Sequence, residues 1–197
     1  MSRVKKEGII LGIDPGTRIM GYGIIRVQGN HTEPVGMGVI RMTSIADPYR
    51  RMSHILEKMY ELLDTYRPDY MAIEAPFYSK NVQSMLKLGR AQGVAIAAAL
   101  SRNVPVCEYA PRKVKMAVTG RGAASKEQVA VLVKKILNIQ EEGVPQDATD
   151  ALAVALCHAH RPDLPENSAQ GSTASSKAGS SWEAFVSKNP DRVKDLR

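Results

Sequence analysis

The order of strand-like and helix-like segments is the feature that most limits how this chain can fold. Three segments of β-type composition follow one another closely, at residues 9–13, 22–27 and 35–42. Two more, at 70–74 and 104–109, are separated by a segment with helical character. The short early connections predict an antiparallel meander, and the helix–strand units that follow extend the same sheet. We therefore expect an α/β protein with a mixed five-stranded sheet and helices on both faces.

The expected helices lie between and after these strands. The first begins at Asp47-Pro48, carries apolar residues three and four positions apart, and ends before Pro68. The others are expected at about 82–101, 112–118, 125–137 and 147–160.

The composition changes near Leu164, where a long Ser-, Ala- and Gly-containing segment begins. Such a composition is typical of flexible linkers. We expect residues 1–163 to form one domain and residues 164–197 to be a flexible, disordered C-terminal tail. Trp182, Phe185 and Val186 in this tail are either a short docking motif or residues of a loose tail without a role.

The chain contains no apolar run of the roughly 18 residues that a membrane helix needs, and its start is a poor signal peptide. We therefore expect no membrane association and a cytoplasmic location. Cys107 and Cys157 lie in apolar surroundings and belong to no Cys-x-x-Cys pair, so we interpret them as core residues in a reducing compartment.

The net charge of +7 is unevenly distributed. Between Arg112 and Lys135 there are seven basic residues, and Glu127 is the sole acid. This segment is either a solvated basic surface or a surface that binds a polyanion.

Two of the expected strands end in an acid that is closely followed by proline. Asp14 precedes Pro15, and Glu74 comes two positions before Pro76. Each acid alone is open to a plain interpretation, an Asx turn for Asp14 and a solvent-facing charge for Glu74. If the first and fourth strands are neighbours, both carboxylates lie at the sheet edge where α/β proteins bind ligands.

Two further acids, Asp147 and Asp150, begin the last expected helix. Residues three apart share a helix face. Asp147 as an N-cap, with Asp150 in the first turn, is the alternative to a functional role. Four clustered carboxylates repel one another unless a cation neutralises them, and oxygen ligands favour Mg²⁺ or Mn²⁺ over Zn²⁺. Two such ions, roughly 3.5–4 Å apart, can hold a phosphodiester, activate a water and stabilise the leaving oxygen.

Several motifs resemble those of the RuvC family of crossover junction resolvases, in family order from about residue 9 to residue 160. They are Gly12-Ile13-Asp14-Pro15-Gly16-Thr17, Gly21-Tyr22-Gly23, Ile73-Glu74, Phe77, Lys80-Asn81, Leu86-Lys87-Leu88-Gly89-Arg90-Ala91, Gly93-Val94-Ala95 and Asp147-Ala148-Thr149-Asp150-Ala151-Leu152-Ala153. The resemblance implies an RNase H-like fold. It also implies a nuclease of DNA recombination and repair that resolves four-way (Holliday) junctions by paired symmetric nicks.

The same resemblance implies roles for particular residues and partners. Asp14, Glu74, Asp147 and Asp150 are implied as catalytic ligands of two Mg²⁺ ions, with Mn²⁺ as a substitute. The family acts as a homodimer on junction DNA and works with the RuvA–RuvB branch-migration complex. Small residues at Gly89 and Gly93, four apart, agree with close approach of another helix, although packing on the chain's own sheet is the alternative.

The DNA contacts implied by the resemblance lie in two segments. Phe77 is implied to stack on bases, with Lys80 beside it, although a core position for Phe77 stays open. Lys115 and Lys126 match family lysines that face DNA phosphates. Arg112 is expected to be a more general phosphate contact.

Three other functions compete with this one. An actin-like or sugar-kinase ATPase shares the opening Gly-Ile-Asp motif but needs two such domains, for which 163 residues are too few. A nuclease of the same fold that acts on structured RNA is a nearer alternative. A junction-binding protein without cleavage activity is the third, and the four acids argue against it.

Overall fold

The structure is a computed structural model that describes residues 7–76 and 81–160. These residues belong to the first of two units, Met1–Leu164 and Pro165–Arg197, into which the chain divides. The expected tail, 164–197, and the expected DNA contacts Phe77 and Lys80 lie outside the described residues.

The described residues form the mixed five-stranded sheet that the sequence predicts. Its strands are β1 (Glu7–Asp14), β2 (Ile19–Gln28), β3 (His31–Arg41), β4 (Tyr70–Glu74) and β5 (Val106–Tyr109), in the spatial order β3-β2-β1-β4-β5. β1, β2 and β3 pair antiparallel, which confirms the meander, whereas β4 pairs parallel with both β1 and β5. The central strand β1 therefore has an antiparallel neighbour on one side and a parallel neighbour on the other.

The edge strand β3 is longer than the sequence indicated. Its expected start was residue 35, after the turn at Gly29-Asn30. Pro34 lacks the N–H that a central strand donates, yet it lies inside the strand. In the structure β3 begins at His31, and the pairing with β2 shifts register where Ile24 faces Gly36 and Ile25 faces Pro34. An edge position and a bulge are the two places where a strand accommodates proline.

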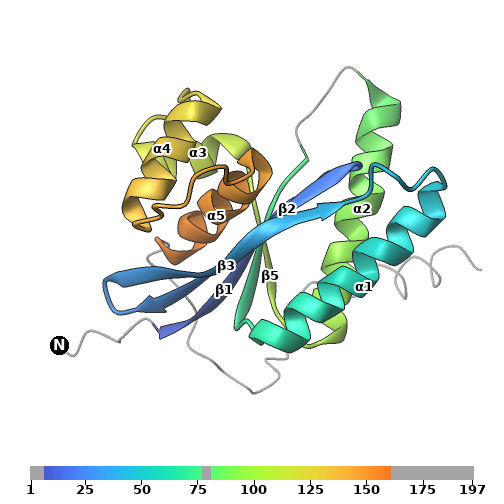
Figure 1. Ribbon diagram of the computed structural model, residues 1–197, viewed down its shortest axis with the longest axis horizontal. Coiled ribbons are helices and arrows are strands. Elements are labelled where there is room, and N and C mark those ends of the chain that lie inside the picture. The colour runs from blue at the N-terminus through green and yellow to red at the C-terminus, as the bar shows by residue number, and fades with distance from the viewer. Residues whose placement is uncertain (1–6, 77–80, 161–197) are drawn as a thin grey trace, which may run out of the picture. The chain divides into compact units, whose positions relative to one another are not determined.

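Five helices cover the two faces of this sheet (Figure 1). They are α1 (Pro48–Tyr66), α2 (Val82–Ser101), α3 (Pro111–Thr119), α4 (Lys126–Ile136) and α5 (Gln146–Ala159). α1 and α2 lie on one face, and α3, α4 and α5 lie on the other. The expected start of α1 is confirmed, because the Asp47 side chain caps this helix by accepting a hydrogen bond from the Arg50 N–H at 2.7 Å.

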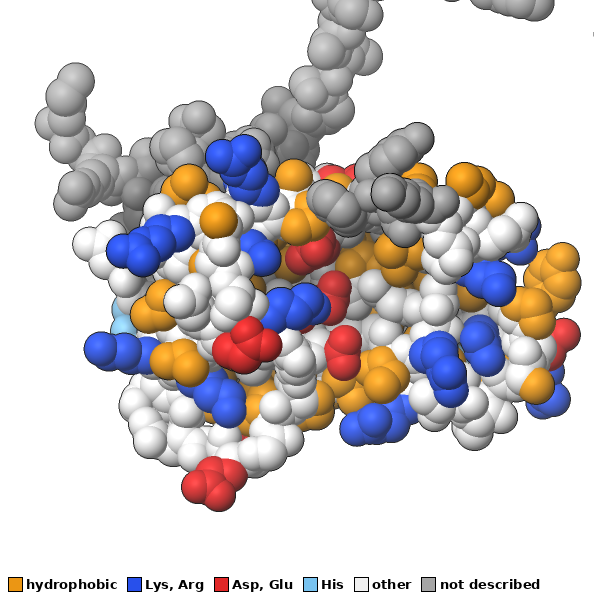
Figure 2. Space-filling model, turned by 90° about the horizontal axis from the view of Figure 1, so that it is seen from above, with side chains coloured by type: hydrophobic (Ala, Val, Ile, Leu, Met, Phe, Trp, Pro, Cys, Tyr) orange, Lys and Arg blue, Asp and Glu red, His pale blue; other side chains and the backbone are white. Residues whose placement is uncertain are grey.

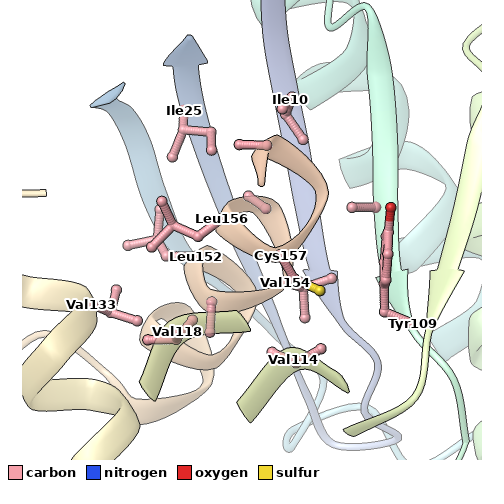
Figure 3. Close-up of a cluster of buried hydrophobic side chains, with 14 of the residues drawn as sticks. Ile10, Ile25, Tyr109, Val114, Val118, Val133, Leu152, Val154, Leu156 and Cys157 are labelled. Atoms are coloured by element: carbon pink, nitrogen blue, oxygen red, sulfur yellow. The ribbon is translucent and has the colours of Figure 1, made fainter. Parts of the chain in front are cut away.

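Alternation along the strands builds two hydrophobic cores from one sheet. Ile10 of β1 faces the core under α3, α4 and α5, where Figure 3 shows it with Leu152, Leu156 and Cys157. Its neighbour Leu11 faces the opposite core, under α1 and α2. Both expected core cysteines are in or against the first of these cores, Cys157 within it and Cys107 packed against it.

Three glycines let α5 lie directly on the sheet. Gly12 of β1 pairs with Gly23 of β2, and Gly21 pairs with Asp14. A Cβ atom on Gly12 would collide with the carbonyl oxygen of Ala151, and one on Gly21 would collide with that of Asp147. The backbone of α5 therefore rests on the backbone of β1 and β2, and this contact fixes the height of the helix above the strands. We call Gly12, Gly21 and Gly23 the glycine floor.

None of the helices among the described residues is both long and apolar enough to cross a bilayer. The cytoplasmic location stays a prediction from the sequence.

Candidate active site

Two of the four acids come together because of the parallel pairing between β1 and β4. Ile13 is the register partner of Ile73. Asp14 and Glu74 are the next residues of these adjacent strands, so they lie side by side at the same end of the sheet. The sequence hypothesis required the first and fourth strands to be neighbours, and they are.

The other two acids come from α5, which rests on the glycine floor. α5 begins at Gln146, and Pro145 is its N-cap residue without a side-chain hydrogen bond. Asp147 is therefore inside the first turn, and its alternative interpretation as an N-cap is wrong. Asp150 lies one turn further along and is buried, with 8% of its surface exposed. A buried carboxylate needs a strong partner, which a solvent-facing charge at a helix start does not.

Electrostatics show that the acids act on one another. Burial, and next the negative charges of Glu74 and Asp150, raise the pKa of Asp14 from 3.8 to about 7. Burial and the charge of Asp150 also raise the pKa of Glu74. Like charges that share a partly buried site disfavour ionisation of each member. The cluster therefore has more negative charge than its surroundings neutralise.

One lysine reaches into this cluster. The Lys126 ammonium at the start of α4 donates a hydrogen bond to Oδ2 of Asp150 at 2.7 Å. Burial alone would lower the pKa of Lys126, but the hydrogen bond and charge of Asp150, and the charges of Asp14 and Glu74, raise it. Lys126 therefore stays charged and partly offsets the repulsion among the acids.

A cleft of about 300 Å³ opens beside the acids. Its wall consists of Glu74, Pro111, Val114, Lys115, Lys126, Val129, Asp150 and Ala153. Two expected DNA contacts, Lys115 and Lys126, are thus in the same cleft as two of the acids, and Lys115 lowers the pKa of Glu74. Arg112 is exposed on α3 and is not part of this wall. Figure 2 shows acidic side chains gathered near the centre of this face with Lys or Arg side chains beside them.

The donor set suits a hard divalent cation, because all four acids offer carboxylate oxygens. Burial, and then the charges of the neighbouring carboxylates, raise the pKa of Asp14, and a cation bound there would offset both effects. As the side chains stand in residues 7–76 and 81–160, no three Asp, Glu, His or Cys residues converge closely enough to hold an ion. The metal-ligand assignment of Asp14, Glu74, Asp147 and Asp150 stays a prediction at this point.

Gln92 is a residue at this site that the sequence reasoning missed. It is buried in α2, and its side-chain amide donates to the carbonyl oxygen of Glu74 at 3.5 Å and to Glu108 at 3.2 Å. Gln92 thereby links the backbone of Glu74, at the end of β4, to the side chain of Glu108 in β5. The signal was available, because Gln92 is a polar residue on the same helix face as Ala91, Ala95, Ala98 and Ala99.

The sheet order, the helices on both faces and the acids at the ends of β1 and β4 define a class, the RNase H-like proteins. Solved structures agree with this class. The Thermus thermophilus RuvC structure determined in complex with a Holliday junction substrate aligns with a TM-score of 0.72 and 35% identity, over 77% of this chain and 93% of that one.

The family follows from the sequence comparisons. The family model of crossover junction endodeoxyribonuclease RuvC matches residues 10–158. The crossover junction endodeoxyribonuclease RuvC of Bacteroides fragilis is 52% identical over 191 residues, 96% of this chain and 97% of the relative. The crossover junction endodeoxyribonuclease RuvC of Porphyromonas gingivalis is 50% identical over 191 residues, which cover 96% of this chain and 98% of the relative. The chain belongs to the RuvC family.

Proposed function

We propose that this chain is a structure-selective endodeoxyribonuclease that resolves four-way (Holliday) DNA junctions by paired symmetric nicks in DNA recombination and repair. The carrying observation is that Asp14, Glu74 and Asp150 repel one another electrostatically at the end of the sheet, next to a cleft with two lysines. Family membership supports the choice of junction DNA as the substrate.

Nucleases of this family depend on divalent metal ions, and we propose Asp14, Glu74, Asp147 and Asp150 as the ligands of two Mg²⁺ ions, which Mn²⁺ can replace. Bound there, the ions supply an activated water and neutralise charge on the phosphate and the leaving oxygen. The protein side chains hold this site through two adjacent strand ends and one helix. Rigid backbone elements of this kind keep catalytic groups in place more accurately than loops do.

The basic residues around the cleft are proposed to bind the DNA backbone. Lys115 and Lys126 line the cleft and face the scissile phosphate, whereas Arg112 contacts the backbone further away. Val114 and Val129 contribute apolar side chains to the lining of the same cleft. Phe77 and Lys80 keep their proposed contacts with the opened junction, and they lie outside the described residues.

The proposed enzyme is a homodimer, because two nicks at symmetric positions require two sites related by a twofold axis. A stripe on α2 suits the interface. Val82, Leu86 and Leu100 are apolar yet more than half exposed, and space is open around Gly89 and Gly93. These five residues follow one helix face at spacings of three, four or seven. An exposed stripe of apolar and small residues is suited to close contact with a second helix.

The dimer is tested by the molar mass in solution, measured by light scattering after size exclusion. Leu86→Glu should shift the mass from dimer to monomer, because it places a charge in the stripe. Val131→Glu, at an apolar position on α4 that is more exposed than Leu86, is the control and should leave the mass unchanged. A dimeric Leu86→Glu variant would contradict the α2 interface. A working partnership with the RuvA–RuvB complex is proposed from the family alone and is tested by co-purification on junction DNA.

The activity is tested with a labelled synthetic four-way junction, in Mg²⁺ and in EDTA, beside matching duplex and single-stranded DNA. Paired symmetric nicks in the junction alone, abolished by EDTA and by Asp14→Asn, are the expected result. Asp14→Asn should retain junction binding. Tight binding without cleavage in any metal would favour a purely architectural protein. Neither binding nor cleavage would favour structured RNA as the substrate.

A further inference from the structure

Lys126 stands at a place that a cation ordinarily avoids. It is the first residue of α4, where the unpaired N–H groups of the helix already carry partial positive charge. Its backbone is fixed by a capping box, in which the Ser125 hydroxyl accepts from the Gln128 N–H at 3.3 Å and the Gln128 side chain accepts from the Ser125 N–H at 3.0 Å. The acids in front of the helix explain the lysine, since they attract both its ammonium and the helix end.

The two partners of the Lys126–Asp150 ion pair differ in their freedom to move. The Asp150 side chain is only 10% exposed and is held by the buried helix α5, whereas the Lys126 side chain is 60% exposed. Most of the lysine side chain is therefore accessible to solvent, and its ammonium reaches the carboxylate at 2.7 Å. Rotation of a flexible four-carbon side chain is enough to take the ammonium away, without movement of either helix.

Lys126 also has a second possible partner within reach. It lines the same cleft as Lys115, where the proposed function places a DNA phosphate. The ammonium cannot neutralise Asp150 and bind that phosphate at full strength together. A divalent ion held by the carboxylates would repel the ammonium and take over the negative charge that it neutralises.

From these contacts we infer that Lys126 changes partners when metal binds: it is the counter-ion of Asp150 in the metal-free protein and becomes a phosphate ligand in the metal-loaded protein. This inference rests on the proposed function, because it takes the four acids as the metal site. It makes Lys126 a positioning residue that couples metal loading to substrate contact. Metal-free enzyme then holds junction DNA with one phosphate contact fewer.

The first test measures Mn²⁺ affinity by electron paramagnetic resonance, without DNA and without turnover. Lys126→Met removes the competing cation and should bind Mn²⁺ more tightly than the unmodified protein, by up to about five-fold, the upper end of the scale for a partly exposed ion pair. Lys135→Met removes the same charge from the other end of α4 and should stay within about two-fold. Equal or weaker Mn²⁺ binding by Lys126→Met than by Lys135→Met would overturn the inference.

Two further variants keep this test decisive. Lys126→Gln retains a hydrogen-bond donor without the charge, and it replaces Lys126→Met if the latter fails to fold by circular dichroism. Asp14→Asn should lose most of the Mn²⁺ affinity. If Asp14→Asn binds Mn²⁺ normally, the proposed metal site itself is wrong, and this failure is separate from a failure of Lys126.

The second test measures binding of an uncut four-way junction against salt concentration, in Ca²⁺ and in EDTA. Each phosphate contact contributes about 0.9 to the slope of log affinity against log salt. Lys126→Met should lower that slope by about this amount in Ca²⁺ and leave it unchanged in EDTA. The same loss of slope in both conditions, or no loss in Ca²⁺, would show that Lys126 does not change partners.

Discussion

Asp14→Asn should make the metal-free protein more stable at neutral and alkaline pH, although it removes a residue that we place at the centre of catalysis. The pKa of Asp14 rises to about 7 in the folded protein because of burial and the charges of Glu74 and Asp150. Ionised Asp14 therefore costs folding free energy whenever no cation is bound. Asparagine has nearly the same shape and no charge, so the substitution removes this cost.

The magnitude follows from the change in pKa. A rise from 3.8 to about 7 corresponds, at about 1.4 kcal/mol per tenfold change in the ionisation constant, to at most about 4 kcal/mol. The buried amide of asparagine needs hydrogen bonds of its own, which reduces the gain to about 2 kcal/mol. At 2–4 °C per kcal/mol for a chain of this size, we expect the Tm to rise by roughly 4–8 °C.

The sign of the pH dependence is fixed by the raised pKa. Below pH 3.8, Asp14 is protonated in both the folded and the unfolded protein, and its contribution to stability is fully present. This contribution is lost as the pH rises toward and through about 7, the pKa in the folded protein. The gain from Asp14→Asn should therefore be largest near pH 8 and shrink toward pH 4.

Thermal unfolding in EDTA, followed by circular dichroism at pH 8 and at pH 5, measures this difference. Asp47→Asn is the matched control, because asparagine serves equally well at this exposed helix cap and should leave Tm unchanged. Added Mg²⁺ should raise the Tm of the unmodified protein more than that of Asp14→Asn. An Asp14→Asn variant that melts at or below the Tm of the unmodified protein at pH 8 would refute the electrostatic reasoning.

Three further substitutions test the framework around the site. Gly12→Ala should destabilise the fold by about 1–3 kcal/mol or more in urea, because its Cβ collides with the backbone of Ala151, and unchanged stability would contradict the close contact. Gln92→Ala should lower the free energy of unfolding by about 1–2 kcal/mol, because it removes the hydrogen bond to the Glu74 carbonyl oxygen. It should also lower kcat for junction cleavage more than it weakens junction binding, and a loss of binding alone would argue against this role. Leu152→Ala, a fully buried truncation, should cost about 2–5 kcal/mol by the same urea assay, and a cost below 1 kcal/mol would show that the core is loosely packed there.

Local signals in the sequence were enough for much of the fold. The apolar run before Pro76 predicts β4 with the bounds that the structure has, and Asp47-Pro48 predicts the start of α1. Both rest on the chemistry of neighbouring residues, a proline that limits the backbone and an acid that caps a helix. The expected start of β3 was too late because the bulge in its pairing with β2, which accommodates Pro34, leaves no local signal in the sequence.

The candidate site divides in the same way. The four acids were identified from strand ends and a helix start, and the pairing of β1 with β4 confirms the neighbouring strands on which that hypothesis depended. The ion pair between Lys126 and Asp150 was beyond the sequence, because it joins residues 24 positions apart through the packing of two helices. Whether such a pair forms depends on the relative positions of the two helices to within a few tenths of an ångström, and the spacing of residues in the sequence does not determine these positions.

The glycine floor has a consequence for how this site tolerates change over time. Beneath Asp147 the backbone of α5 lies against the backbone of β1 and β2. The distance between the acids on α5 and those on the strands therefore does not depend on the size of a side chain between them. Apolar residues elsewhere in the two cores can be exchanged for others while that spacing is retained. The arrangement of the four acids is thereby protected from substitutions in the rest of the sequence. The three positions of the glycine floor, in contrast, accept no other residue unless the helix moves.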